Sequence, residues 1–99
     1  MFNNKIIVIS GGSSGLGLAM AHLLYKKNAC LVLISRSLKN LENAKKEIEG
    51  RNTSGKQVKI FACDLSNKNA VDQTFKAIQD SVGKPDILIN SAGVLKNLR

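Results

Sequence analysis

Glycine and serine residues near the amino terminus are spaced in a way that suits the binding of an anion. Gly11, Gly15 and Gly17 follow the pattern G-x-x-x-G-x-G, with Ser13 and Ser14 between the first two. Glycines let a chain turn sharply and let a pyrophosphate approach its backbone. A helix that begins there adds free amides, the positive end of its dipole and nearby hydroxyl donors. The pattern predicts a diphosphate site, and the alternative is a glycine-rich turn that binds no ligand.

Two other phosphate-binding patterns do not fit this segment. A P-loop needs Lys and Ser/Thr directly after its last glycine, but Gly17 is followed by Leu18. The dinucleotide spacing G-x-G-x-x-G is also absent from the sequence. The glycine pattern therefore has to be interpreted together with the residues that follow the next strands.

A cation follows the second apolar run of the chain. Dinucleotide-binding units that take NAD place Asp or Glu there to bond the ribose hydroxyls, but the first carboxylate after this run is Glu42. A guanidinium attracts a 2′-phosphate and can bond it through two parallel N–H groups, whereas a carboxylate repels it. Arg36, with Ser35 before it, therefore predicts NADP(H), and Lys39 is a candidate second cation. The alternative is an ordinary surface arginine.

Few other side chains are candidates for catalysis or metal binding. Tyr25 is the only tyrosine and His22 the only histidine, and both lie on the helix predicted after the glycines. Cys30 and Cys63 lie in strand-like apolar runs without a CxxC spacing, which is typical of small buried side chains. We expect no catalytic residue, no metal ligand and no disulfide in this chain.

Alternating strands and helices must position these residues. Continuous apolar runs at 6–9, 30–34, 58–63 and 86–90 are typical of strands buried on both faces of a parallel sheet. Segments with helical spacing separate them, so the predicted order is β-α-β-α-β-α-β. This order predicts the α/β class and a Rossmann-type doubly wound sheet. If the glycine turn marks the switch point, the strand order is 3-2-1-4.

The helices have predictable apolar faces and caps. Ser37 is expected to cap the second helix, and Ser66 or Asn67 the third. The expected apolar faces are Leu16, Ala19, Met20, Leu23 and Leu24 in the first helix, Leu41, Ala44 and Ile48 in the second, and Val71, Phe75, Ile78 and Val82 in the third.

Composition excludes several classes of protein. The 99 residues are 43% hydrophobic and 22% charged, which is near the globular norm. The net charge of +8 is spread over scattered basic residues, and one tyrosine and three phenylalanines are too few for a platform that stacks bases. We therefore expect no nucleic-acid partner. No apolar stretch approaches the roughly 18 residues of a membrane span.

The glycine pattern and the residues after the next three strands together resemble the short-chain dehydrogenase/reductase family. Its Thr-Gly-x-x-x-Gly-x-Gly signature corresponds to residues 10–17, with Ser10 in place of the threonine. The other matching segments, each after a strand, are Arg36, Asp64-Leu65 and Asn90-Ser91-Ala92-Gly93. The resemblance covers nearly all of residues 5–95, and it implies that residues 1–99 form the N-terminal NADP-binding part of a single Rossmann domain.

The resemblance also implies roles for the later motifs. Asp64 and the Leu65 backbone would hold the adenine ring, and Asn90, Ala92 and Gly93 would line the ribose side of the cofactor. The structural alternatives are a loop cap for Asp64 and a strand-end cap for Asn90. The family commonly has Asn-Asn-Ala-Gly where this chain has Ser91 at the second position. That departure weakens any expectation of hydrogen bonds that tie the sheet together at residue 91.

The family reduces ketones to alcohols with NADPH. Within it, the chain is most similar to reductases of 3-ketodihydrosphingosine, which share the Gly-Gly-Ser-Ser-Gly loop, the Arg36 position and a helix like residues 41–49. A phosphate-pocket lysine found in some of them would fall at Asn40, where this chain departs. The close rival is a 3-oxoacyl-type or other short-chain reductase, and a non-catalytic NADP-binding module is a further alternative.

The family's catalytic Tyr-x-x-x-Lys falls well beyond Gly93, and Tyr25 does not match that spacing. We expect a fragment of a longer reductase or a truncated product, inactive alone, whose exposed edge strand at 87–89 favours association. A lipid ketone substrate, and any association with a membrane, would need later segments. The resemblance implies the cytoplasmic side of the endoplasmic reticulum, or otherwise the cytoplasm, and predicts no particular oligomeric state.

Overall fold

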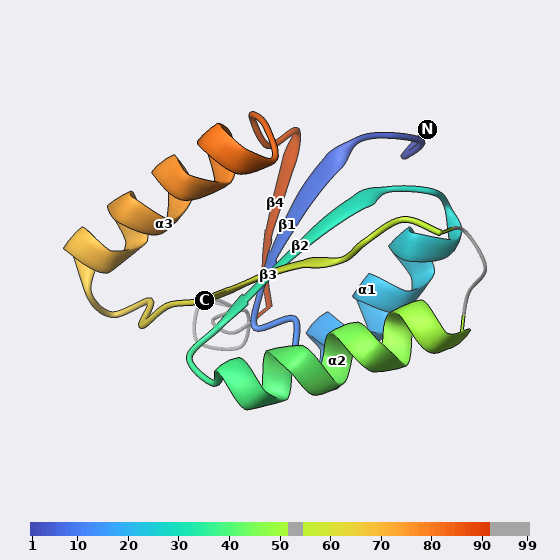
Figure 1. Cartoon of the computed structure of the whole chain (residues 1–99), viewed down its shortest axis with the longest axis horizontal. Helices are drawn as coiled ribbons and strands as arrows, with labels where there is room; N and C mark the ends of the chain where they lie inside the picture. The colour runs from blue at the N-terminus through green and yellow to red at the C-terminus, as the bar shows by residue number, and fades with distance from the viewer. Residues whose placement is uncertain (52–54, 92–99) are drawn as a thin grey trace, which may run out of the picture.

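The computed structural model describes residues 1–51 and 55–91, which form a parallel sheet with helices on both faces (Figure 1). The strand order is β3-β2-β1-β4, and every neighbouring pair is parallel. This confirms the predicted fold class and strand order. The elements in chain order are β1 (Ile6–Ser10), α1 (Gly15–Lys26), β2 (Cys30–Ser35), α2 (Leu38–Arg51), β3 (Lys59–Ala62), α3 (Lys68–Ser81) and β4 (Ile87–Asn90).

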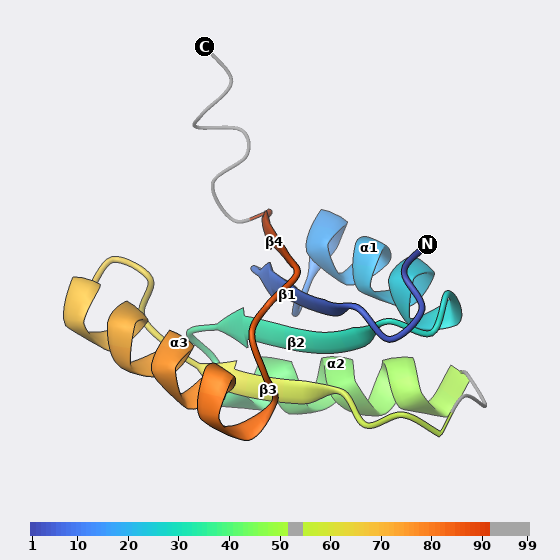
Figure 2. The ribbon, with the colours of Figure 1, turned by 90° about the horizontal axis from the view of Figure 1, so that it is seen from above.

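The strand order reverses direction at β1, and the helices change face with it. Strands β2 and β3 extend the sheet to one side of β1, whereas β4 pairs with β1 on the other side. Viewed from above, α1 and α2 cover one face of the sheet and α3 covers the opposite face (Figure 2). In open sheets of this kind the crevice at the reversal, outside the carboxyl ends of the strands, is where ligands bind.

Each face of the sheet has its own apolar core. Ile7 and Ile9 of β1 pack with α1 and α2, and Val8 between them packs on the α3 side with Val32 and Ile78. All five of these side chains are 0% exposed. Burial on both faces explains why the strands are continuous apolar runs rather than alternating ones.

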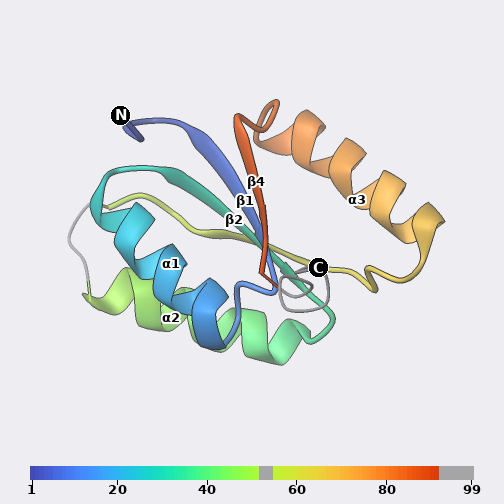
Figure 3. The same cartoon turned by 180° about the vertical axis from the view of Figure 1, so that it is seen from behind.

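The predicted apolar face of α1 is wrong for several of its residues, although Leu24 packs against the core. Leu16 and Leu23 are 61% and 60% exposed, and the helix instead buries Gly17, Ala21 and Tyr25. These three positions are four residues apart and so lie on one face of the helix. Gly17 lies close to the backbone of the preceding turn, and Tyr25 packs in the core. Figure 3 shows α1 beside α2 on the same side of the sheet.

The helix caps agree with their predicted residue types. The Asn40 amide donates to the Ser37 hydroxyl oxygen at 3.1 Å at the start of α2. The Ala70 amide donates to Asn67 Oδ1 at 3.1 Å, so Asn67 rather than Ser66 caps α3. The predicted inner face of α2 is confirmed by the buried Leu41, Ala44 and Ile48, whereas only Ile78 of the predicted α3 face is fully buried.

Three further features of the described residues concern the cysteines, the absence of candidate metal sites and membrane-spanning helices, and the edge strand β4. Cys63 is buried, Cys30 is half-buried, and both are free thiols. Within residues 1–51 and 55–91, no group of three His, Cys, Asp or Glu side chains is placed to hold a metal ion, and no helix is long and apolar enough to cross a membrane. Strand β4 pairs with β1 alone in this part of the chain, and Leu88 on it is 57% exposed.

Candidate functional site

The carboxyl ends of the four strands lie level at one edge of the sheet. Ser10 at the end of β1 is in register with Ile34 of β2 and with Asn90 of β4, and Ser35 is in register with Ala62 of β3. The segments that follow these strands carry the glycines, Arg36, Asp64 and Ser91. The fold therefore brings together at one edge the motifs that the sequence separates by as many as 80 residues.

The turn after β1 leaves the start of α1 open to a ligand. Gly11 and Gly15 have positive φ angles of 74° and 56°, a conformation that glycine adopts without a Cβ penalty. The first amides of a helix have no acceptor within the helix. Ser14 is the N-cap residue, but its side chain makes no capping bond and the first turn has no acidic residue. These amides and the positive end of the helix dipole are therefore suited to an anion.

The glycine at position 17 is required by packing. A Cβ built on Gly17 would lie 2.2 Å from the Gly11 carbonyl oxygen, far inside van der Waals contact. The first turn of α1 thus presses directly on the backbone of the preceding turn. This tight cradle fits the interpretation of the glycine pattern as a phosphate-binding turn, in which the third glycine permits close helix–strand packing.

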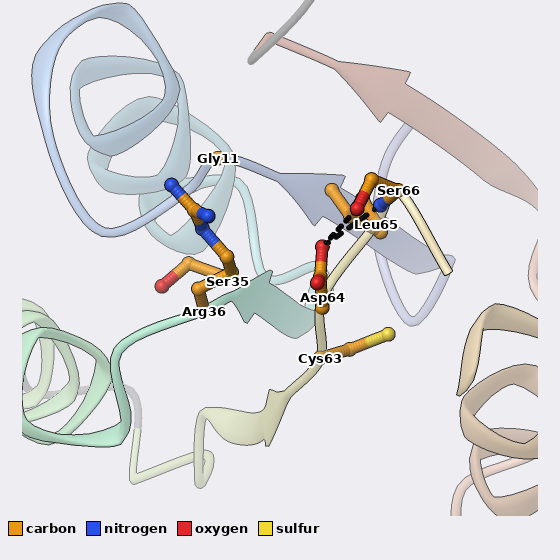
Figure 4. A pocket seen from close by; sticks show the side chains of 7 residues that line it. All are labelled: Gly11, Ser35, Arg36, Cys63, Asp64, Leu65 and Ser66. Atoms are coloured by element: carbon orange, nitrogen blue, oxygen red, sulfur yellow. Dashed lines mark hydrogen bonds between the residues drawn. The ribbon is translucent and has the colours of Figure 1, made fainter. Parts of the chain in front are cut away.

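A pocket of about 320 Å³ lies beside this turn at the ends of β1, β2 and β3. It contains four of the predicted site residues, namely Gly11, Arg36, Asp64 and Leu65, and its remaining lining residues are Ser35, Cys63 and Ser66 (Figure 4). Arg36 follows β2 directly, and its side chain is exposed. The glycine turn and the cation predicted to bind a 2′-phosphate therefore line one cavity.

Hydrogen bonds hold the Asp64 carboxylate in place. Asp64 Oδ1 accepts from the Ser66 hydroxyl at 2.7 Å and from the Ser66 backbone amide at 3.0 Å (Figure 4). These two bonds and, less strongly, the positive charge of Arg36 lower the pKa of the Asp64 carboxyl below its ordinary value. Asp64 is therefore a fixed, ionised hydrogen-bond acceptor, which suits the amino group of a purine ring.

Five of the remaining predicted residues lie on the glycine turn, at the start of α1 and at the end of β4. Ser13, Ser14, Gly15 and Gly17 follow Gly11 along the turn and the first turn of α1. Asn90 ends β4, and its Oδ1 accepts from the Ser10 hydroxyl at 2.9 Å. Ala92 and Gly93 lie outside the described residues. His22 and Tyr25 lie away from this pocket: His22 pairs with Glu47 at 2.6 Å, and Tyr25 is in the core.

Sequence reasoning missed two polar residues of this site. Ser66 orients Asp64, and the pattern Asp-x-Ser, in which an aspartate can bond the backbone two residues on, was the available signal. The replacement of the family's asparagine by Ser91 weakened any expectation of sheet-tying bonds at this position. The Ser91 hydroxyl nevertheless donates to the Ser10 carbonyl at 2.7 Å and lies 3.1 Å from the Gly11 carbonyl oxygen.

Comparisons with known proteins agree with this geometry. A family model described as short chain dehydrogenase matches residues 5–99. The fatty acyl-CoA reductase of Acinetobacter baylyi is 42% identical over 89 residues, which are 90% of this chain and 29% of that protein. L-sorbose reductase of Gluconobacter frateurii, solved with NADPH and L-sorbose, superposes with a TM-score of 0.80 and 33% identity over 88% of this chain and 32% of that chain.

A structure with the other nicotinamide cofactor is similar as well. NAD+-bound xylitol dehydrogenase has a TM-score of 0.80 and 26% identity, again over 88% of this chain and 32% of that chain. The chain therefore spans about a third of the length of these relatives. The backbone alone does not distinguish the two cofactors, so the distinction depends on the side chains at the pocket.

Proposed function

Because the chain belongs to the short-chain dehydrogenase family, we propose that it forms the NADP(H)-binding part of an oxidoreductase that reduces a ketone to an alcohol. The observation that carries the proposal is that the glycine turn and Arg36 line one cavity at the switch point of the sheet. A turn that suits a diphosphate beside a cation that suits a further phosphate matches the two charged parts of NADP(H).

Each part of the cofactor has residues that would hold it. The amides at the start of α1, with the Ser13 and Ser14 hydroxyls, would bind the diphosphate. Arg36 would bond the 2′-phosphate, and Asp64 with the Leu65 backbone would hold the adenine ring. Asn90, and by resemblance Ala92 and Gly93, would line the ribose on the nicotinamide side. When bound, NADPH supplies the hydride that is transferred to the carbonyl carbon.

The preference for NADP(H) over NAD(H) rests on charge. L-sorbose reductase was solved with NADPH and xylitol dehydrogenase with NAD+, although the two chains superpose on this one equally well. In this chain the residue after β2 is arginine, and Asp64, the one carboxylate among the described residues that line the pocket, lies near enough to that arginine for its positive charge to lower the Asp64 pKa. A 2′-phosphate would therefore meet a cation rather than a carboxylate.

For the substrate we propose a lipid ketone, with 3-ketodihydrosphingosine reduced to dihydrosphingosine in sphingolipid biosynthesis as the specific case. This rests on the resemblance of the Gly-Gly-Ser-Ser-Gly loop, Arg36 and the helix at 41–49 to reductases of that substrate. A 3-oxoacyl-type or other short-chain reductase is the rival, and the 42% identity to a fatty acyl-CoA reductase is compatible with either lipid substrate. With a sphingoid substrate, the protein would act at the cytoplasmic side of the endoplasmic reticulum.

A non-catalytic NADP-binding role is the second candidate. The 99 residues contain one tyrosine, Tyr25, which is 2% exposed and whose hydroxyl donates to the Lys56 carbonyl. It cannot protonate a substrate from that position. On this proposal the chain binds the cofactor and turns over no ketone by itself.

A calorimetric titration of the full chain with NADPH and with NADH tests the proposal. We expect NADPH to bind at least about tenfold more tightly, because one charge-assisted bond to phosphate contributes about 1.5–3 kcal/mol. Equal affinity for the two cofactors would contradict the assignment to NADP(H), and absence of binding would contradict the cofactor role itself. Consumption of NADPH with a 3-keto lipid, followed by its absorbance, would in turn separate a catalytic chain from a binding module.

A further inference from the structure

We propose that Ser91 is a positioning residue for the diphosphate-binding turn. Its hydroxyl holds the backbone carbonyls of Ser10 and Gly11 toward β4, so that the Gly12 amide points away from β4 and can donate to an anion. The inference rests on the proposed function, because it names a residue that sets the geometry of that same site. It does not follow from the family pattern, in which a serine at this position is a departure.

The backbone amide and the hydroxyl of Ser91 connect it to the end of β1 and to the turn. The Ser91 backbone amide donates to the Ser10 carbonyl at 3.1 Å, which extends the pairing of β4 with β1. The Ser91 hydroxyl oxygen lies 2.7 Å from the same carbonyl oxygen and 3.1 Å from that of Gly11. Because a hydroxyl has a single proton, it shares or alternates that proton between the two carbonyls. Both carbonyls consequently face β4.

The direction of these carbonyls decides where the neighbouring amides point. In a trans peptide the C=O and N–H groups point to opposite sides, and no described peptide bond is cis. The Ser10 carbonyl faces Ser91, and accordingly the Gly11 amide donates the other way, to the Ile34 carbonyl of β2 at 2.8 Å. By the same rule, the Gly11 carbonyl held toward Ser91 directs the Gly12 amide away from β4.

Glycine makes this peptide orientation easy to lose. Gly11 has a φ of 74°, and a residue without a Cβ reorients its backbone at little steric cost. If the peptide after Gly11 rotated, a carbonyl oxygen would replace an N–H group near the diphosphate, and the two partial negative charges would repel. The Ser91 hydroxyl opposes that rotation by bonding the Gly11 carbonyl.

The start of α1 is fitted to the same hydroxyl. A Cβ built on Gly17 would lie 2.5 Å from Ser91 Oγ as well as 2.2 Å from the Gly11 carbonyl oxygen. The end of β4, the turn and the first turn of α1 therefore meet at a single point. A second link from the same strand, in which the Ser10 hydroxyl donates to Asn90 Oδ1 at 2.9 Å, strengthens the connection of β4 to the end of β1.

The test measures the affinities of two ligands, NADPH and 2′-AMP, for one set of variants of the full chain. NADPH engages both the turn and the Arg36 pocket, whereas 2′-AMP carries the adenosine and the 2′-phosphate but no diphosphate. We expect Ser91→Ala to weaken NADPH binding about tenfold, the size of one lost hydrogen bond near an anion, and to change 2′-AMP binding less than about twofold. The matched control is Ser81→Ala, which removes a hydroxyl that donates to the Ala77 carbonyl on the exposed side of α3, and it should change neither affinity.

Retained 2′-AMP binding shows that each variant is folded. Ser91→Cys nearly keeps the side-chain volume and has only a weak S–H donor, so it should weaken NADPH binding in the same direction even if Ser91→Ala does not fold. The positioning role would be overturned if Ser91→Ala and Ser91→Cys left the NADPH affinity unchanged. It would also be overturned if both variants lost affinity for NADPH and for 2′-AMP by the same factor. Failure of the wild-type chain to bind either ligand would instead contradict the proposed function.

Discussion

Replacing Arg36 by glutamine removes one positive charge at the rim of the pocket and leaves a shorter, neutral polar side chain. Arg36 follows β2 directly and lines the cavity together with Gly11 and Asp64. Its guanidinium lies near enough to Asp64 for its charge to lower the pKa of that carboxyl. We expect Arg36→Gln to weaken NADPH binding and to leave NADH binding nearly unchanged, because only NADPH carries the 2′-phosphate.

The size of the effect follows from the exposure of the site. A hydrogen bond to a charged group contributes about 1.5–3 kcal/mol, and solvent-exposed ion pairs contribute about 0–1 kcal/mol. Arg36 is exposed before the ligand binds and could form two parallel bonds to the phosphate. A loss of about 1.5–2 kcal/mol is therefore expected, which corresponds to a roughly 10- to 30-fold weaker affinity for NADPH.

Isothermal titration calorimetry with each cofactor measures this difference. Lys46→Gln is the control, because it removes the same charge from an exposed position of α2 that does not line the pocket. Added salt should reduce the preference of the wild type for NADPH by screening the charge. If Arg36→Gln weakened both cofactors equally, or neither, the attribution of the preference to a guanidinium–phosphate contact would be refuted.

Three further substitutions test other contacts of the site and the fold. Gly17→Ala should abolish measurable NADPH binding and lower the free energy of unfolding by about 1–3 kcal/mol, as overpacking does; unchanged calorimetric and thermal transitions would contradict the close packing. Ser66→Ala should raise the pKa of Asp64 in an NMR titration, and an unaltered pKa would show that the hydroxyl bond is absent in solution. Glu49 accepts from Lys45 Nζ at 2.8 Å and from the Val58 amide at 2.7 Å. Burial raises its pKa, but these bonds outweigh burial and leave the pKa lowered. Glu49→Gln should therefore lower the free energy of unfolding by about 1 kcal/mol at neutral pH. This difference from wild type should disappear as the pH falls through the lowered folded-state pKa, because the wild-type carboxylate is then protonated too. A difference that is independent of pH in denaturant titrations would contradict this expectation.

Local signals predicted the architecture of this chain well. Continuous apolar runs identified strands buried on both faces, and the glycine turn after the first strand placed the reversal of strand order at β1. Ser37 and Asn67 were predictable as caps because a capping side chain bonds an amide three residues along the chain. Such features need only neighbours in sequence.

Tertiary contacts explain where the predictions failed. The spacing of Leu16 and Leu23 suited an apolar face, but α1 packs with Gly17 against the preceding turn and leaves these two leucines exposed. Ser91 bonds carbonyls 80 and 81 residues earlier in the chain, and no local pattern reports such a contact. Residues that hold a site in place from another strand become visible only once the strand order is known.

The most direct test of the account is an NMR titration of the isotopically labelled chain with NADP+. The account predicts that the largest amide shifts fall on residues 11–17, on Arg36 and on Asp64 to Ser66, around the pocket at the ends of β1, β2 and β3. The largest shifts could instead fall on the apolar groove between α1 and β4, which Leu23, Leu24 and Ile87 help to line. That result would contradict the placement of the cofactor at the glycine turn.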